Sequence, residues 1–319
     1  MRFATLPNGT PDGELHVVSR DNTRSAPCKA ATTLQDALER WDSLQEALKE
    51  EYDDLCAAGG VPFDPARALA PLPRAWQWLD ASAYDSHGKL MDKAFKVIAE
   101  KIPGKPLMYQ GVSDEFYSAT QDVPFPTEDD GIDFEGEFGV ITTAVPMGTR
   151  NTEGHIALLI QLNDWSLRKL APAEMKTGFG WLQAKPKCSV APVAITPDEL
   201  GVAWRDCRVD LPLHVQWNGE TFGKPQGYHM SFGMDELVAH AAYSRALPAG
   251  TMIGTGTVSN DSYREVGSAC IAERRGIEIV DHGEPRTPFM SFGDHVRMEC
   301  TAADGGPLFG PIEQKVVRG

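Results

Sequence analysis

The amino-terminal residues alternate weakly between apolar and polar side chains, which predicts a β-hairpin at the start of the chain. The alternation runs over residues 1–19, and a period of two residues is typical of a strand with one buried face. The pairs Asn8-Gly9 and Asp12-Gly13 interrupt the apolar positions, and such pairs favour the tight turns of hairpins. We therefore expect a small hairpin before the first helix.

A second pattern, with a spacing of three or four residues, predicts one amphipathic helix after the hairpin. Thr32 and Gln35 form a capping-box pattern at its start, and Gly59-Gly60 would end it. One face of this helix should pack against the protein while the other faces water. The apolar positions that carry the pattern are Leu34, Leu38, Trp41, Leu44, Leu48, Tyr52 and Leu55.

Proline punctuates the segment that follows the predicted helix. Positions 62, 65, 71 and 73 are all proline, which predicts an extended linker because proline disfavours regular helix and central strand. We place a domain boundary near Arg74. The prediction is a small amino-terminal domain of residues 1–74 and a larger domain of residues 75–319.

The larger domain contains short apolar runs separated by glycine and proline, which is typical of many short strands. One helical stretch, residues 234–246, lies among them. We expect a β-rich α+β protein, with a mixed sandwich or barrel-like larger domain and a small α+β amino-terminal domain. The runs that we interpret as strands are residues 138–144, 156–162, 211–216, 252–258 and 277–280.

The composition is that of an ordinary folded protein and excludes several classes of partner. The 319 residues carry a formal net charge of −15, which would repel phosphate backbones and anionic lipids, so we expect neither nucleic acid nor membrane as a partner. No stretch approaches the roughly 20 apolar residues of a membrane span, and no basic segment precedes an apolar run at the start. We therefore expect a cytoplasmic location.

Two carboxylates lie close together in a segment that reads as a strand over residues 133–140. Glu135 and Glu137 are two positions apart, so on a strand their side chains share a face. Like charges on one face repel each other unless the face meets water or a cation binds them. For this pair alone, a solvated strand edge is the simpler interpretation.

A further carboxylate follows the apolar run of residues 156–162, which reads as a buried strand. The run ends in Asn163-Asp164-Trp165-Ser166. A carboxylate at the end of a buried strand needs a partner, and a divalent cation shared with Glu135 and Glu137 would supply one. The alternative is that Asp164 only caps the following turn. Oxygen ligands without His or Cys favour Mg²⁺, Ca²⁺ or Mn²⁺ over Zn²⁺.

The order of these motifs resembles the fumarylacetoacetate hydrolase family. The matching series is Glu135-x-Glu137, then Asn163-Asp164-Trp165-Ser166-x-Arg168, then Lys185. In that family an upstream Asp is also a metal ligand, and Asp80 fits because its spacing to His87 is the family's. The resemblance therefore implies a metal site formed by Asp80, Glu135, Glu137 and Asp164.

Further matches extend the resemblance to catalytic and substrate-binding residues. It implies that His87 is a catalytic base and that Lys185 and Arg168 counter negative charge on the substrate. Tyr109-Gln110-Gly111 resembles the family's substrate-binding Tyr-x-Gly, and residues 254–257 resemble its late Gly-Thr turn over the substrate, which implies binding roles for Tyr109 and Thr257. The larger domain, residues 75–319, would be the catalytic domain.

The chain departs from the family pattern at two positions. Relatives pair the catalytic His with a Glu on a late strand, but counting from Gly267-Ser268 places Ile271 there. Glu273, two residues on, would share the same strand face and is a candidate catalytic residue. Asp85 or Asp92 could orient the imidazole instead. A family Gln also appears as Ala171.

The resemblance implies a metal-dependent hydrolase that cleaves a carbon–carbon bond in a 1,3-diketo acid, such as fumarylacetoacetate or fumarylpyruvate, in the catabolism of aromatic amino acids or other aromatic compounds. The cation would hold the substrate oxygens while His87 activates a water. Alternatives are a 2-oxo acid decarboxylase, a hydratase or isomerase, or a non-catalytic binding relative. The family also implies a homodimer formed through the carboxy-terminal domain.

Overall fold

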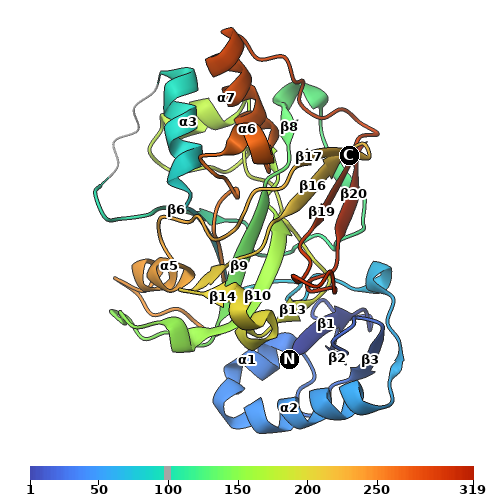
Figure 1. The fold of residues 1–319 in the computed structure, drawn as a ribbon. Coiled ribbons are helices and arrows are strands. Elements are labelled where there is room, and N and C mark those ends of the chain that lie inside the picture. Colours follow the sequence, from blue (N-terminus) through green and yellow to red (C-terminus); the bar gives the residue numbers. More distant parts are fainter. Residues whose placement is uncertain (97–101) are drawn as a thin grey trace.

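A large mixed sheet forms the centre of the computed structural model, which describes residues 1–96 and 102–319 (Figure 1). Strands β18 and β5 run parallel, and the other strand pairs in the described part of this sheet are antiparallel. In sheet order the strands are β4 (Val61–Pro62), β3 (Arg24–Pro27), β2 (Glu14–Val18), β1 (Arg2–Leu6), β13 (Ala194–Ile195), β10 (Ile156–Asn163), β9 (Gly136–Thr142), β18 (Thr251–Gly254), β5 (Gln77–Ser82) and β6 (Leu107–Gly111), with β12 (Ser189–Val190) beside β10.

A second sheet shares a hydrophobic core with the first. Val140 and Leu159 of the central sheet belong to the same buried cluster as Val215 and Val296 of the second sheet. The Gln161 side chain also joins them, because its Nε2 donates to the Met298 carbonyl at 3.0 Å. In sheet order its strands are β17 (Glu220–Gly223), β16 (His214–Trp217), β19 (His295–Glu299), β20 (Ile312–Arg318) and β7 (Val123–Phe125). Two separate two-stranded sheets pair β8 (Ile132–Asp133) with β11 (Ser166–Leu167), and β14 (Trp204–Arg205) with β15 (Arg208–Val209).

The amino-terminal hairpin is confirmed, since β1 and β2 pair antiparallel. The single long helix is wrong: the chain forms α1 (Leu34–Glu39) and α2 (Trp41–Ala57), with a break at Arg40, where φ is −115° and ψ is 19°. Thr33 rather than Thr32 caps α1, because the Thr33 side chain accepts a hydrogen bond from the Asp36 N–H. Gly59-Gly60 follows the end of α2 with positive φ values, as that pair favours.

Residues on the two sides of the predicted boundary near Arg74 share one sheet and one core. Strand β1 pairs with β13 of the larger part. Phe3 and Trp41 lie in the same buried cluster as Ile141 and Leu158. The amino-terminal segment therefore extends the central sheet, and the boundary itself stays a prediction.

Helices α3 and α7 lie side by side at the end of the molecule away from the amino-terminal segment (Figure 1). Their close approach uses a glycine, because a Cβ at Gly276 would lie 3.3 Å from the sulfur of Met91. The predicted strand over residues 277–280 is wrong, since these residues lie within α7. The helices are α3 (Asp85–Phe95), α4 (Ala171–Met175), α5 (Met234–Ala241), α6 (Tyr263–Val266) and α7 (Ile271–His282), with 3₁₀ turns η1 (Pro65–Arg67), η2 (Glu128–Asp130), η3 (Glu153–His155) and η4 (Pro197–Ala203).

The prediction of a strand over residues 277–280 rests on a short apolar run, but the longer context is helical. Ile271 and Ile277 are buried on one side of α7, while Glu278 and Asp281 accept hydrogen bonds on its outer side.

Among the described residues, no helix has the length and apolar composition that crossing a membrane requires.

Candidate functional site

Three buried carboxylates meet where neighbouring strands of the central sheet end. Asp80 lies on β5, Glu137 on β9, and Asp164 directly after β10. One oxygen from each lies within 4.8 Å of the others. Three of the four predicted metal ligands therefore form one cluster, although they are as far apart as positions 80 and 164 in the sequence.

The predicted Gly-Thr turn lies against this cluster, and glycine is required there. Gly254 on β18 pairs with both neighbouring strands, and a Cβ on it would lie 2.7 Å from Oδ1 of Asp80 and 2.8 Å from Oε2 of Glu137. The Gly256 N–H, at a φ of 80°, donates to the same two oxygens at 3.2 and 3.0 Å. The turn thus brings the two carboxylates together.

Glu135 faces the same site but contacts the cluster through a cation. It lies between β8 and β9, so the single strand expected over residues 133–140 is interrupted at this position. Its Oε1 accepts from Nζ of Lys185 at 2.6 Å, and the same Nζ donates to Asp164. Its Oε2 accepts from the hydroxyl of Thr257. Glu135 as a direct metal ligand stays a prediction.

The charges of this group are unbalanced. Burial and the neighbouring Asp164 raise the pKa of Asp80 well above its ordinary value, and burial together with Asp80 does the same for Glu137. Burial alone would also raise the pKa of Glu135, but Arg168 and Lys185 outweigh it and the pKa lies below its ordinary value. If all are ionised, the four carboxylates outnumber the two cations Lys185 and Arg168, and Arg168 also pairs with the buried Asp133.

The donor set fits a divalent cation. Oε1 of Glu137 is buried and has no hydrogen-bond partner among the described residues, although a buried carboxylate oxygen normally needs one. The clustered donors are all carboxylate oxygens, the ligands that hard cations prefer. Asp80, Glu137 and Asp164, with Glu135 beside them, are therefore the residues that could hold Mg²⁺, Ca²⁺ or Mn²⁺.

Asp164 is held by three different donors. The hydroxyl of Tyr109, on β6, donates to its Oδ2 at 2.7 Å, and Lys185 donates to the same oxygen. The thiol of Cys188 donates to its Oδ1 at 2.9 Å, and burial raises the pKa of this thiol, which keeps it protonated as a donor. Cys188 was missed from the sequence, where it is one of six scattered cysteines.

A cavity of about 910 Å³ is lined by Tyr109, whose hydroxyl contacts the cluster. The ring of Trp181 packs edge-on against that of Tyr109, with centroids 4.8 Å apart. No sequence pattern indicated Trp181, since it lies in a glycine-rich loop. The cavity is also lined by the exposed cations Lys105, Arg150 and Arg245.

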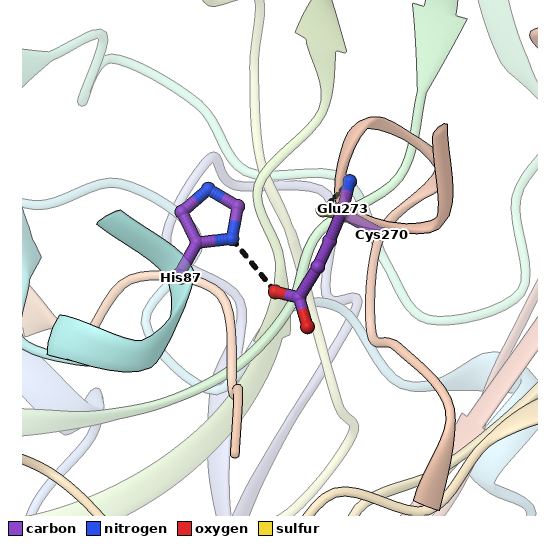
Figure 2. Close-up of side chains that lie close together, drawn as sticks. All are labelled: His87, Cys270 and Glu273. Atoms are coloured by element: carbon purple, nitrogen blue, oxygen red, sulfur yellow. Dashed lines mark hydrogen bonds and ion pairs between the residues drawn. The ribbon is translucent and has the colours of Figure 1, made fainter. Parts of the chain in front are cut away.

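The second part of the site is a hydrogen-bonded pair between His87 and Glu273 (Figure 2). Nδ1 of His87, in the first turn of α3, lies 2.7 Å from Oε2 of Glu273. The His87 side chain is 18% exposed, whereas that of Glu273 is fully buried. Of the three carboxylates considered as partners, Glu273 rather than Asp85 or Asp92 makes this contact. The expected strand for Glu273 is wrong, because it lies in the first turn of α7, where Cys270 is the N-cap.

Two serines extend the pair into the protein. The hydroxyl of Ser259 donates to the other oxygen of Glu273, at 3.1 Å, and that of Ser86 donates to Ser259 at 2.9 Å. Ser259 closely follows Thr257 and Gly256, which contact the carboxylates. The chain from residue 254 to residue 259 therefore connects the carboxylate cluster to the His87 pair.

Arg168 lies between Glu135 and a buried carboxylate that the sequence did not single out. Its Nη2 is 3.1 Å from Oε1 of Glu135, and its Nε donates to Oδ2 of Asp133 at 2.7 Å. Although burial alone would lower it, these two carboxylates raise the pKa of Arg168 well above its ordinary value. Arg168 is therefore a partly buried cation beside Glu135, and its role in countering charge on the substrate stays a prediction.

Most of the chain matches family models. Residues 77–317 match the model described as fumarylacetoacetate (FAA) hydrolase C-terminal, and residues 1–74 match the fumarylacetoacetase N-terminal domain 2. No curated protein matches the chain significantly.

Solved structures share the fold. Maleylpyruvate hydrolase from Sphingobium sp. SYK-6, in complex with manganese(II) and pyruvate, is 17% identical over 100% of both chains, with a TM-score of 0.66. The 5-carboxymethyl-2-hydroxymuconate delta-isomerase from Mycobacterium smegmatis is also 17% identical, over 100% of this chain and 99% of that one, with a TM-score of 0.59. The predicted architecture, a small amino-terminal part and a β-rich catalytic part, is confirmed.

Proposed function

The chain belongs to the fumarylacetoacetate hydrolase family, and we propose that it is a divalent-metal-dependent hydrolase that cleaves a carbon–carbon bond in a 1,3-diketo acid. Fumarylpyruvate and fumarylacetoacetate, from the catabolism of aromatic compounds or aromatic amino acids, are the preferred candidates. The carrying observation is that a carboxylate cluster and a His87–Glu273 pair are connected by one short segment, residues 254–259.

We propose that Asp80, Glu135, Glu137 and Asp164 hold the metal. When bound, a divalent ion would supply the positive charge that orients the oxygens of a diketo acid and polarises its carbonyl. The excess of carboxylates over cations in the group and the unpartnered Oε1 of Glu137 support this assignment. The manganese(II) in the structure of maleylpyruvate hydrolase also supports a divalent ion of this class.

His87 is the proposed general base. Its Nδ1 faces the Glu273 carboxylate, an arrangement that assigns the proton to Nδ1 and leaves Nε2 as the acceptor. In that tautomer Nε2 can take a proton from a water that attacks the substrate carbonyl. Glu273 then stabilises the imidazolium that forms, which is the role of a carboxylate behind a catalytic histidine.

Lys185 and Arg168 are the proposed charge-stabilising residues. Both cations are fixed beside Glu135, where they would counter negative charge that builds on the substrate oxygens as the bond breaks. Tyr109 and Thr257 are the proposed substrate-binding residues. Their hydroxyls contact Asp164 and Glu135, so they border the position that the substrate would occupy.

The cavity beside Tyr109 supports a substrate whose tail carries a carboxylate. Lys105, Arg150 and Arg245 line it together with one carboxylate, Glu236. Glu236 pairs with Arg208 instead, and the described part of the chain shows no ion pair for the three cations. Three cations around one cavity, none with an ion pair among the described residues, stand out in a chain with a net charge of −15. The double negative charge of fumarylpyruvate, one carboxylate at each end, matches this distribution.

An absorbance assay on a panel of acylpyruvates tests the proposal. Each compound loses its diketo absorbance when it is cleaved, and the products distinguish the reactions. Pyruvate plus a second acid indicates the proposed hydrolysis, CO₂ indicates a decarboxylase, and an isomer of unchanged mass indicates an isomerase. Binding of the panel without any turnover indicates a non-catalytic relative, and any of these last three outcomes would refute the proposal.

We further propose that the protein is a homodimer formed through its carboxy-terminal domain. Closed two-fold pairs are the commonest oligomers of soluble proteins. Light scattering should give twice the chain mass of 34.8 kDa. A mass that stays at one chain over a wide concentration range would contradict the proposal.

A further inference from the structure

Asp133 is a fully buried carboxylate that contacts two different parts of the site. Its Oδ1 accepts the backbone N–H of Ile271 at 2.7 Å, and its Oδ2 accepts the N–H of Ala272 at 2.9 Å. The same Oδ2 accepts from Nε of Arg168 at 2.7 Å. One side chain therefore accepts three hydrogen bonds, two from the start of α7 and one from the guanidinium.

The two backbone bonds fix the helix end that carries Glu273. The first N–H groups of a helix have no partner within the helix, and Asp133 satisfies those of the two residues directly before Glu273. A shift of α7 would move the Glu273 carboxylate away from His87, because the two side chains are joined at 2.7 Å across two helices. Asp133 therefore acts on the His87 pair through the backbone of α7.

The third bond fixes the cation on the other side. Arg168 reaches Glu135 with one nitrogen while Asp133 holds another. Without Asp133 the guanidinium would keep its charge but lose the contact that sets its orientation. The carboxylate thus connects Arg168, beside the proposed metal ligands, with the helix that orients the catalytic imidazole.

Stability alone explains this arrangement poorly. A buried ion pair often contributes little net stability, because removing both charges from water costs about as much as their attraction returns. Helix N–H groups can also be satisfied by a neutral Ser, Thr or Asn. The alternative explanation is that a charged residue that bonds to both Arg168 and α7 fixes the distance between them.

We propose that Asp133 is a positioning residue that sets Arg168 and the His87–Glu273 pair relative to each other. The proposal rests on the proposed function for its kinetic consequence. It makes a structural claim as well, that a change at Asp133 or Arg168 is transmitted to the hydrogen bond between His87 and Glu273.

Asp133→Asn is the main test. The amide oxygen can still accept one N–H of α7, but the amide nitrogen would face Arg168 as a second donor. We expect kcat to fall about 10²-fold, the loss that a displacement near 1 Å can cause, with KM and the affinity for Mn²⁺ changed less than about threefold. The downfield N–H proton resonance of His87, assigned by its loss in His87→Ala, should shift.

The matched control is Glu199→Gln. Glu199 is also a buried carboxylate, paired with Arg2, but it touches none of the proposed site residues. This variant should lose stability and keep both kcat and the His87 resonance. Arg168→Gln covers the case in which Asp133→Asn does not fold, because it should shift the same resonance through Asp133.

Two results would overturn the proposal. One is an unchanged His87 resonance in both Asp133→Asn and Arg168→Gln. The other is a kcat in the combined variants that falls by the product of the fold losses of Asp133→Asn, Arg168→Gln and Glu273→Gln measured singly. Residues that act through one another are not additive, so such independent losses would contradict the proposal. If the wild-type protein cleaves no diketo acid, the proposed function fails, and the resonance still decides the role of Asp133.

Discussion

The carboxylate cluster and the His87–Glu273 pair are held together by different forces. Asp80 and Glu137 lie on strands whose separation is set by backbone hydrogen bonds to β18. His87 and Glu273 lie on two helices, 186 positions apart in the chain, and meet only because the helices pack side by side (Figure 1). The strand pairing of the sheet therefore sets the geometry of the first region, and the packing of two helices sets the geometry of the second.

The two regions also differ in charge. The cluster gathers like charges, and burial with these neighbours raises the pKa values of Asp80 and Glu137. The pair instead matches a proton donor with a carboxylate, and Ser259 satisfies the second oxygen. Changes in the first region should therefore alter metal binding, whereas changes in the second should alter turnover with the metal retained.

Metal removal should have the largest effect. Exhaustive chelation should reduce turnover to background, because no cation would remain to hold the substrate oxygens, and Mg²⁺, Ca²⁺ or Mn²⁺ should restore it. Glu137→Gln should bind metal more weakly, since the charge of the ligands sets the affinity for hard cations. Steady-state kinetics with metal analysis check both. Full activity in protein shown to be free of metal would exclude a role for the cluster in the reaction.

His87→Ala should have the next largest effect. Loss of general-base help should lower kcat by about 10²- to 10⁴-fold, while metal content stays at the wild-type level because His87 is not part of the cluster. Rapid kinetics and titration of Mn²⁺ measure the two quantities. An intact kcat in a folded, metal-loaded variant would show that another base acts.

Glu273→Gln sharpens this result. It should also lower kcat, because the amide cannot stabilise the imidazolium, and its effect should largely disappear when His87 is already replaced. Independent losses in the double variant would separate the two residues functionally, despite their 2.7 Å contact.

Gly254→Ala should have a moderate effect on the first region. The new Cβ would lie 2.4 Å from the ring of Trp78 and within 2.8 Å of oxygens of both Asp80 and Glu137, so the ring and the carboxylates must shift, and metal affinity should fall about 10- to 100-fold. Gly154→Ala is the matched control, because a Cβ there meets no atom within 4 Å. Calorimetric titration of both variants with Mn²⁺ decides; equal affinities would mean that the cluster does not bind the ion.

The smallest expected effect is on stability and pH. The pKa values of Asp80 and Glu137 are raised above 3.8 and 4.5, so the folded metal-free protein holds these protons more tightly than the unfolded chain. Their contribution to stability is complete at low pH and is lost as the pH rises through the raised pKa values. The difference in Tm between metal-free Glu137→Gln and the metal-free wild type should therefore change in favour of the variant as the pH rises from about 5 to 8. A constant difference would show that Glu137 does not carry this proton.

The regular patterns of the chain predicted much of the fold because they depend on near neighbours. The hairpin and the strands over residues 156–162 follow from periods of two residues and continuous apolar runs. The same reasoning failed over residues 277–280, where a short apolar run lies within a longer helix. The same reasoning also predicted one helix where the structure has two, α1 and α2, since the apolar period continues across the break at Arg40.

The sequence by itself singled out Glu135, Glu137 and Asp164 as candidate metal ligands, because a carboxylate at the end of a buried strand needs a partner, and it added Asp80 through the family resemblance. Only the tertiary structure decided that Glu273, from the start of a helix, is the carboxylate that contacts His87. It alone decided that Asp133 joins Arg168 to that helix. The physical reason is that the direction of a side chain follows from its own strand or helix, whereas its partner depends on which elements pack together across the whole chain.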